Sequence, residues 1–556
     1  MKNLVFSKVA LKMGSPGITD WSQDIPTPEN CVDLSIGQPD FAVSNNAIQG
    51  LYNSAKNGFN GYQDSQGIKP LRNAILKQFN LRKERDFDVS ITCGATAGLY
   101  LSLMTCFNPG DEILITDPYF VQYIELAKIH NLNIKLINIY PDFILTFDKI
   151  KSSITSKTKG IIINSPNNPT GCVINKNEQK SIIEYLDKKD IYVIFDNIYR
   201  DYLYYDETTN EIPVVYSKNV VYVNGFSKSH RVTGWRIGYV IAQKEIIHYL
   251  SELQAQLYQG VTSVAQYGIL ESLNEDLKPM INIYKKRLEY IKSNLDKNYI
   301  QSNTQGGFFV FIEVPKILNM SSLEYCKILK ANGLIVVPGL VFSKQDTHFR
   351  ISICKDILEI KKGVKILNNT FLQLKIETIK RYIENILNAK ISLVGSHSIG
   401  IGLPNSDIDF AIGYENNNEM YRIEKILNEN SFEFRGVRPS TNKTFRLLYS
   451  FYWKDQFVDI VVLCNDDYTH LVNGLSQANL TITKEEKEII ITTKKKLEQI
   501  DIEKYENYKL DIYKKYCPKL LWMNDIEICK YLKSKCDETK RKYPDWLRNK
   551  ILEYCI

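Results

Sequence analysis

The sequence predicts an α/β protein built around a doubly wound, mostly parallel sheet. Within residues 45–270, the apolar runs 113–115, 160–163 and 192–195 have the length and composition of buried parallel strands. Segments between them, such as 177–186, place apolar residues at helical spacing. Strands that alternate with helices form βαβ units, which carry ligand groups at the carboxyl ends of the strands.

A smaller α+β domain is predicted to follow this alternating region. A long charged helix begins near residue 275, and strand-like runs occur at 307–311 and 334–337. The N-terminal arm is expected to join this small domain.

A second α+β domain and a helical tail are predicted further along the chain. A helical segment, 376–387, precedes strand-like runs at 391–396, 407–412 and 457–462. The last residues are rich in Lys and Glu at helical spacing. The expected bounds are 1–44 for the N-terminal arm, 45–275 for the large domain, 276–370 for the small domain, 371–483 for the second α+β domain and 484–556 for the tail.

Composition and charge restrict the class of protein. A net charge of +7 is small for 64.3 kDa and argues against nucleic acid as a partner. The 11 cysteines form no CxxC pair, which is typical of a reducing cytosol. Lys8 interrupts the N-terminal segment before any long apolar run, and no stretch approaches the ~20 apolar residues of a membrane span. We therefore expect a cytoplasmic protein without a membrane partner.

The segment 224–238, NGFSKSHRVTGWRIG, places a lysine between two side chains that bind phosphate. Ser227 supplies a hydroxyl directly before Lys228, and Arg236 supplies a guanidinium group eight residues after it. A lysine that forms a Schiff base with an aldehyde cofactor needs such neighbours when the cofactor carries a phosphate.

Four other motifs lie at predicted strand ends. Residues 94–98, GATAG, open a helix whose backbone N–H groups can bind a phosphate. The others are 117–120, DPYF, 165–171, SPNNPTG, and 196–199, DNIY. With the lysine segment, these motifs span about residues 30–355 and resemble, in order, the fold-type I aminotransferases of class I/II, which depend on pyridoxal phosphate (PLP).

The resemblance implies that PLP is the cofactor and assigns its partners. Lys228 would carry the Schiff base and then act as general base and acid between Cα and C4′. Asp196 would keep the pyridine nitrogen protonated, and Tyr199 would donate to O3′. Asn168 would bind O3′ and the substrate carboxylate.

The remaining cofactor contacts implied by the resemblance concern the ring face and the phosphate. Phe120, with Tyr119 as the second choice, would lie flat on the pyridine ring. The residues implied to bind the phosphate are Ala95, Thr96, Ser227, Arg236 and, from the neighbouring subunit, Tyr62. A homodimer with shared sites is therefore expected.

The resemblance also implies how the substrate is held. Arg350 would bind the α-carboxylate through two hydrogen bonds, and Gly37 belongs to a loop that closes over the substrate. A retained carboxylate favours transamination between an amino acid and a 2-oxo acid over decarboxylation. The activities of racemases, β-lyases and cyclising synthases of the same fold stay open as alternatives. The sequence does not identify the residues that would bind the substrate side chain.

The second α+β domain contains three carboxylates in strand-like runs. Asp407 and Asp409 alternate, so they share one face of a strand, and Asp459 lies on a further strand. Such carboxylates can hold the two divalent metals that align a nucleoside triphosphate with an attacking hydroxyl. The turn formed by Gly395 and Ser396 would bind the triphosphate.

This arrangement over about residues 375–465 resembles the minimal nucleotidyltransferases of the DNA polymerase β-like superfamily. The resemblance implies that Asp407, Asp409 and Asp459 are catalytic and bind Mg2+ or Mn2+. The whole sequence thus predicts a bifunctional enzyme that also transfers a nucleotidyl group to a small-molecule acceptor. Two alternatives for the second domain stay open: a nucleotide-sensing module without transfer, and an antitoxin-like module that modifies protein.

Overall fold

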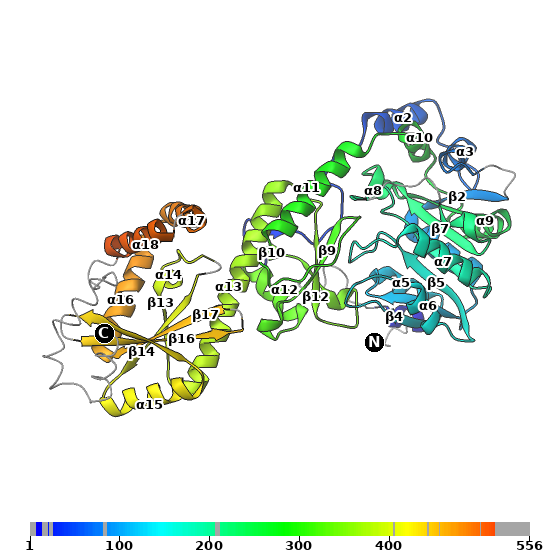
Figure 1. The fold of residues 1–556 in the computed structure, drawn as a ribbon. Helices are drawn as coiled ribbons and strands as arrows, with labels where there is room; N and C mark the ends of the chain where they lie inside the picture. The colour runs from blue at the N-terminus through cyan, green and yellow to red at the C-terminus, as the bar shows by residue number, and fades with distance from the viewer. Residues whose placement is uncertain are drawn as a thin grey trace, which may run out of the picture. The chain divides into compact units, whose positions relative to one another are not determined.

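The computed structural model describes residues 7–13, 21, 26–81, 86–205, 212–403, 406–441, 444–454, 456–500 and 502–516. Contacts divide the chain into two compact units, residues 1–371 and 372–556 (Figure 1). The predicted tail beyond residue 516 and the loop residues 404–405 lie outside the described residues.

The first unit contains the predicted doubly wound sheet (Figure 1). Its seven strands run in the order β2-β8-β7-β6-β5-β3-β4, and all neighbours are parallel except for the two pairings of β8. Strand bounds are β2 Phe87–Cys93, β3 Glu112–Asp117, β4 Asn133–Asn138, β5 Thr158–Asn164, β6 Tyr192–Asp196, β7 Val220–Gly225 and β8 Ile237–Gln243. The predicted α/β class with a mostly parallel sheet is confirmed.

Both faces of this sheet are buried, as successive residues of one strand show by packing into two different apolar clusters. Ile161 and Ile163 of β5 belong to one apolar cluster, whereas Ile162 belongs to another. The helices are α2 Asn45–Lys56, α3 Lys69–Gln78, α4 Gly94–Cys106, α5 Val121–Ile129, α6 Phe147–Ser153, α7 Lys176–Asp187, α8 Phe226–Ser229, α9 Lys244–Tyr258 and α10 Ser263–Ser272. Continuous apolar strands therefore follow from a sheet covered on two sides.

The α+β part of the first unit has two small sheets. One pairs β1 Val32–Asp33 with β10 Leu334–Ile335, and the other has the order β11-β12-β9. The other elements are α1 Lys8–Lys12, α11 Lys278–Asn294, β9 Phe309–Glu313, α12 Ser322–Ala331, β11 Val337–Pro338, β12 His348–Ser352, α13 Ile357–Leu387 and the 3-10 turns Lys316–Leu318 and Gly339–Val341. Two further 3-10 turns belong to the layers of the large sheet: Pro213–Tyr216 contacts β7, and Thr233–Trp235 contacts α8. The run 334–337, predicted as one strand, is therefore divided between two sheets. The sequence did not reveal this division, because a uniformly apolar run carries no signal for where its pairing partner changes.

The second unit contains a five-stranded sheet in the order β13-β14-β17-β16-β15 (Figure 1). Strands β14 and β17 are parallel, and the other neighbours are antiparallel. Its elements are β13 Ser392–Val394, α14 Gly395–Ser398, β14 Ile408–Tyr414, α15 Asn417–Glu429, β15 Glu433–Thr441, β16 Thr444–Trp453, β17 Gln456–Cys464, α16 Asn465–Thr481, α17 Lys484–Ile500 and α18 Ile502–Tyr516. Strands β15 and β16 were not predicted, and the predicted helix 376–387 is the end of the longer α13.

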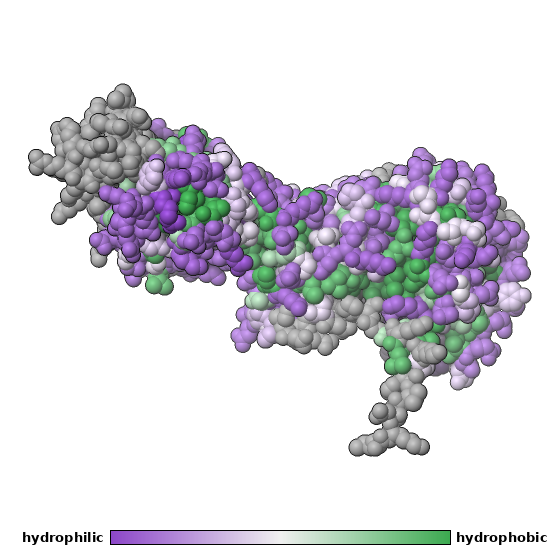
Figure 2. All heavy atoms as spheres, turned by 90° about the horizontal axis from the view of Figure 1, so that it is seen from below, coloured by the Kyte–Doolittle hydropathy of each residue, from purple (hydrophilic) through white to green (hydrophobic). Residues whose placement is uncertain are grey.

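None of the helices in the described ranges combines the length and apolar character that crossing a bilayer requires. On the face drawn in Figure 2, hydrophilic residues cover much of the surface and alternate with smaller apolar areas.

Candidate active sites

A cavity of about 400 Å³ opens in the first unit beside the carboxyl ends of the large sheet's parallel strands. The predicted cofactor and substrate residues that line it are Gly37, Ala95, Thr96, Phe120, Asn168, Asp196, Tyr199, Ser227, Lys228, Arg236 and Arg350. Tyr62 does not line this cavity, and its side chain is 92% exposed. The structure therefore brings residues from distant motifs together around one space.

Lys228 lies on the short helix α8, directly after strand β7. Its Nζ donates a hydrogen bond to the carbonyl oxygen of Gly37 at 2.8 Å. Burial, assisted by the positive charges of Arg350 and Arg236, lowers the pKa of Lys228 to about 8. The amine is thus close to neutrality near physiological pH, as a nucleophile or proton acceptor requires.

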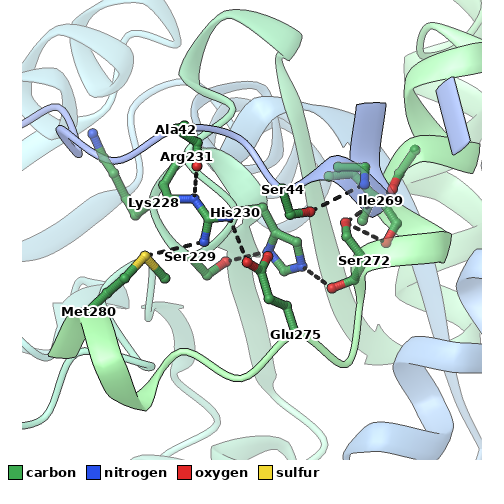
Figure 3. Close-up of polar contacts among 12 residues, drawn as sticks. Ala42, Ser44, Lys228, Ser229, His230, Arg231, Ile269, Ser272, Glu275 and Met280 are labelled. Carbon is green, nitrogen blue, oxygen red and sulfur yellow. Dashed lines mark hydrogen bonds and ion pairs between the residues drawn. The ribbon is translucent and has the colours of Figure 1, made fainter. Parts of the chain in front are cut away.

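His230, two residues after Lys228, is buried and does not line the cavity. Figure 3 shows its ring between Ser229 and Ser272. Its ring nitrogens contact Ser229 Oγ at 2.9 Å and the Ser272 carbonyl oxygen at 3.2 Å. Burial lowers the pKa of His230 to about 4, so the ring stays neutral.

Arg231, just after the lysine helix α8, connects this part of the chain to two other segments (Figure 3). Its Nε donates to the Ala42 carbonyl oxygen at 2.7 Å, and its Nη2 lies 2.7 Å from Glu275 Oε1. Arg231 is buried and has a positive φ of 60°, a costly backbone conformation that the surrounding contacts must maintain. The loop that carries Gly37 is therefore tied to the segment that carries Lys228.

Asp196 ends strand β6 and lines the cavity. Its Oδ2 accepts a hydrogen bond from Tyr123 Oη at 2.6 Å, and its Oδ1 accepts from the backbone N–H of Ile198 at 3.1 Å. Burial raises the pKa of Asp196 to about 6 despite these bonds. Sequence analysis missed Tyr123, although its position one turn after Phe120 was a usable signal.

Arg350 on β12 presents donors to the cavity from among aromatic rings. Nη1 donates to Asn168 Oδ1 at 2.9 Å, and Nη2 donates to the Ser35 carbonyl oxygen at 2.6 Å. The guanidinium carbon lies 4.0 Å from the ring centroid of Phe309 and 4.5 Å from that of Phe342. Among the described residues, its buried Nε has no hydrogen-bond partner. Such an orphaned cationic donor fits a carboxylate ligand.

The N-terminus of α4 and Arg236 form a cradle with the character of an anion site. Gly94 has a φ of +72°, and a Cβ there would collide with the Arg236 guanidinium. No side chain caps α4, so its first N–H groups stay available beside Ala95 and Thr96. The Thr96 hydroxyl bonds Gln122 at 3.0 Å, a further lining residue that sequence analysis missed.

The second unit places two of its three predicted carboxylates side by side. Asp409 on β14 is the register partner of Asp459 on β17, and Asp407 is exposed just before β14. Gly395 has a φ of +68°, and a Cβ there would collide with the Asp409 carboxylate. The adjacent Ser396 is buried at the start of α14. The glycine-serine turn therefore lies directly against the Asp409 carboxylate.

These carboxylates repel one another. Burial and the charge of Asp459 raise the pKa of Asp409 to about 7. Burial also raises the pKa of Asp459, although the Ser450 hydroxyl donates to it. In the part of the chain that the structure describes, no three His, Cys, Asp or Glu side chains are grouped closely enough to hold a metal ion. The predicted metal site stays a prediction, supported by the charge that gathers here.

Comparison with known families agrees with both parts of this geometry. Residues 29–367 match the family model described as "Aminotransferase class I and II", and residues 376–441 match a model described as "Nucleotidyltransferase domain". The chain belongs to the class I and II aminotransferases and carries a nucleotidyltransferase domain after the aminotransferase part.

Relatives and solved structures resemble the aminotransferase part. A probable aspartate aminotransferase of Methanocaldococcus jannaschii is 32% identical over 356 residues, which is 62% of this chain and 94% of the relative. An aspartate aminotransferase of Sulfurisphaera tokodaii is 33% identical over 352 residues, 60% of this chain and 88% of the relative. The structure of the Thermus thermophilus aspartate aminotransferase with maleate is 26% identical with a TM-score of 0.58, covering 61% of this chain and 92% of that one.

The cavity fits PLP, the cofactor of this family. The α4 cradle suits the phosphate, the Lys228 amine suits the aldehyde carbon, and the buried carboxylate of Asp196 suits the protonated pyridine nitrogen.

Proposed function

We propose that this chain is a bifunctional enzyme. The first unit transfers an amino group from an amino acid to a 2-oxo acid with PLP, and the second transfers a nucleotidyl group from a nucleoside triphosphate to a small-molecule acceptor. The observation that carries the first activity is the buried Lys228, which lines the same cavity as the carboxylate of Asp196. Its pKa is about 8.

Each residue of the cavity has a proposed task. When bound, PLP withdraws electrons from the substrate Cα through its protonated ring. Lys228 Nζ, neutral above pH 8, removes the Cα proton, and Asp196 holds the proton on the ring nitrogen. Tyr199 and Asn168, which line the cavity, would hydrogen-bond O3′ of bound PLP, and Phe120 would cover the face of its ring.

Binding of the α-carboxylate is the reason to propose transamination. Arg350 lies among aromatic rings and keeps one buried donor without a partner, which a substrate carboxylate can satisfy. Gly37 brings the N-terminal loop to the same side. Aspartate is the first amino donor to test, because the relatives named above are aspartate aminotransferases.

A homodimer is part of this proposal. The exposed ring of Tyr62 lies in a surface groove of about 470 Å³ formed by residues 60–63 and 258–264. We propose that Tyr62 binds the PLP phosphate of the partner subunit, beside Ala95, Thr96, Ser227 and Arg236.

Reduction and spectroscopy test the transaminase. Borohydride treatment of the PLP-loaded chain, followed by peptide mapping, should attach the cofactor to Lys228. Adding an accepted amino acid should convert the pyridoxal absorbance to that of pyridoxamine, and a 2-oxo acid should reverse it. If label and spectral change are both absent, the first activity is wrong.

The second activity rests on the carboxylates beside the glycine-serine turn. Asp407, Asp409 and Asp459 would hold Mg2+ or Mn2+, and Gly395 and Ser396 would bind the triphosphate. The acceptor oxygen would bond the α-phosphorus, and the bond to pyrophosphate would break with both electrons. The acceptor proton would pass to water.

The two alternatives for the second unit give different results in one experiment. Radiolabelled triphosphates are incubated with the chain, candidate hydroxyl metabolites and a protein extract. Label on a small molecule that Asp409→Asn abolishes supports the proposal. Label on protein indicates the antitoxin-like alternative, and binding without transfer indicates a sensing module.

A further inference from the structure

Three neighbouring strands of the second unit, β14, β17 and β16, carry two of the candidate carboxylates on one face of their sheet (Figure 1). Asp409 of β14 is paired in register with Asp459 of β17, and Asp459 is paired with Ser450 of β16. Residues directly opposite one another on neighbouring strands project from the same face of a sheet. Asp409, Asp459 and Ser450 therefore form one row across the three strands, which we call the carboxylate row.

An aromatic pair stands on the same face, next to the carboxylate row. Phe457 lies two residues before Asp459 on β17, and Tyr452 lies two residues after Ser450 on β16. Strand residues two apart project from the same face, so both rings lie on the side of the carboxylates. Phe457 and Tyr452 are themselves register partners, and their ring centroids lie 4.9 Å apart at an interplanar angle of 64°.

Tyr452 offers its ring at an open end of the sheet. Its side chain is 72% exposed, whereas Phe457 is half-buried beneath it. The residues that alternate with this pair, Phe451 and Val458, pack into the apolar cluster on the other face of the sheet. Strand β15 begins opposite Ser450, so its pairing with β16 stops one row short of Tyr452. The aromatic pair is therefore not part of the core and has room for a flat ligand.

The glycine-serine turn lies on the other side of the carboxylate row. Val394, directly before Gly395, is the register partner of Asp409, and β13 borders β14 on the edge away from β17. Because neighbouring strands lie about 4.8 Å apart and each strand residue advances about 3.3 Å, the Cα atoms of Tyr452 and Asp459 are roughly 8 Å apart. In a nucleotide bound with its triphosphate at the turn and its α-phosphate at the carboxylates, one ribose can span this separation.

We propose that Tyr452, supported by Phe457, stacks on the base of the nucleotide substrate, so that the nucleotidyl-transfer site has an aromatic base-binding subsite on β16 and β17. This inference rests on the proposed second activity. Every nucleoside triphosphate carries a flat aromatic base, whereas a hydroxyl acceptor needs none. The contact with Phe457 restrains the Tyr452 ring, which lowers the entropy lost on stacking. Stacking accepts every base, because each has a π-face.

Binding to the full-length chain tests the inference without turnover. ATP, GTP, CTP, UTP and inorganic tripolyphosphate, which has no base, are titrated by calorimetry in Mg2+ buffer into the wild type, Tyr452→Ala, Tyr452→Phe and the control Tyr421→Ala. Tyr421 is 57% exposed on α15, which packs against the other face of the sheet. We expect Tyr452→Ala to weaken nucleotide binding about 5- to 100-fold through lost stacking, and Tyr452→Phe to retain it. Tripolyphosphate binding and the control should not change.

The base-free probe separates stacking from damage to the fold. Unchanged tripolyphosphate binding by Tyr452→Ala shows that the second unit is intact, and equal weakening of tripolyphosphate and nucleotides overturns the inference. Nucleotide binding within twofold of wild type also overturns it. If that unchanged binding comes with reduced transfer, the ring belongs to the acceptor site instead. If the wild-type chain binds no triphosphate, the proposed second activity fails together with the inference. If Asp409→Asn stops transfer and Tyr452→Ala changes nothing, only the inference fails.

Discussion

Lys228 shows how burial sets the chemistry of a single residue. An ordinary lysine has a pKa of about 10.4 and is charged at neutral pH. Here burial and two nearby cations lower the pKa to about 8. The side chain is thereby prepared to react with an aldehyde before any ligand enters.

The pH dependence of cofactor attachment follows from this shift. Because only the neutral amine attacks the aldehyde, the rate of PLP attachment to the cofactor-free chain should rise with pH, with a midpoint near 8, and then level off. Stopped-flow absorbance between pH 6 and 10 measures it. Arg350→Gln removes a neighbouring cation and should move the midpoint upward. A wild-type midpoint near 10.4 contradicts the prediction.

The pKa of Asp196 depends on the neutral hydroxyl of Tyr123. The hydrogen bond from Tyr123 lowers the pKa of Asp196, and burial raises it more. In Tyr123→Phe the pKa of Asp196 should rise above 6, so its carboxylate should be ionised only at higher pH.

Transamination by Tyr123→Phe should fall about 10- to 100-fold in kcat/KM near neutral pH, because one hydrogen bond to a charged group is lost. The acid limb of the pH profile should also move to higher pH. Steady-state assays across pH check both effects. An unchanged acid limb would show that Tyr123 does not control Asp196.

At the scale of elements, the N-terminal loop is held at several points. Arg350 contacts the Ser35 carbonyl, Arg231 contacts Ala42, and Arg287 makes two hydrogen bonds of 2.8 Å to Asp40. The loop therefore depends on the segment directly after α8, on α11 and on β12 together.

Breaking the Arg231 connection should loosen the loop and destabilise the first unit. We expect Arg231→Met to cost about 1–3 kcal/mol, because it leaves the Ala42 carbonyl and the Glu275 carboxylate without their partner. Glu275→Gln keeps an acceptor and should cost less. Thermal unfolding of both variants, with PLP loading as a second readout, compares them. Equal stability of Arg231→Met and wild type would refute the prediction.

At the scale of the whole molecule, the aminotransferase site is proposed to need two copies of the chain. Tyr62 is 92% exposed and lies away from the cavity of its own subunit. The prediction that Tyr62 of one subunit completes the phosphate site of the other can therefore be tested directly with two variants.

Mixing two inactive variants should restore activity. Lys228→Ala and Tyr62→Ala homodimers should each be impaired, the second through weak PLP binding. After co-refolding, about a quarter of native activity is expected at limiting PLP, because half of the dimers are mixed and each has one intact site. Separately refolded variants mixed afterwards are the control. No recovery in mixed dimers isolated by two affinity tags would place Tyr62 outside the partner's site.

Much of this protein could be read from local patterns. Buried parallel strands leave apolar runs, and phosphate-binding turns leave glycine and serine beside a helix start, so β3, β5, β6 and the lysine segment were predictable. Strands β15 and β16 lacked such a signal. The split of residues 334–337 between two sheets was equally hidden, since strand pairing depends on distant residues.

The sequence by itself determined the chemical classes of the two parts, because Lys228 between Ser227 and Arg236 and the alternating Asp407 and Asp409 are local arrangements. Only the tertiary structure decided what surrounds them. It brought Tyr123 to Asp196, left Arg350 with a buried donor and placed Asp459 opposite Asp409 on the neighbouring strand. Burial and electrostatic interaction depend on neighbours in space, and no spacing along the chain reports them.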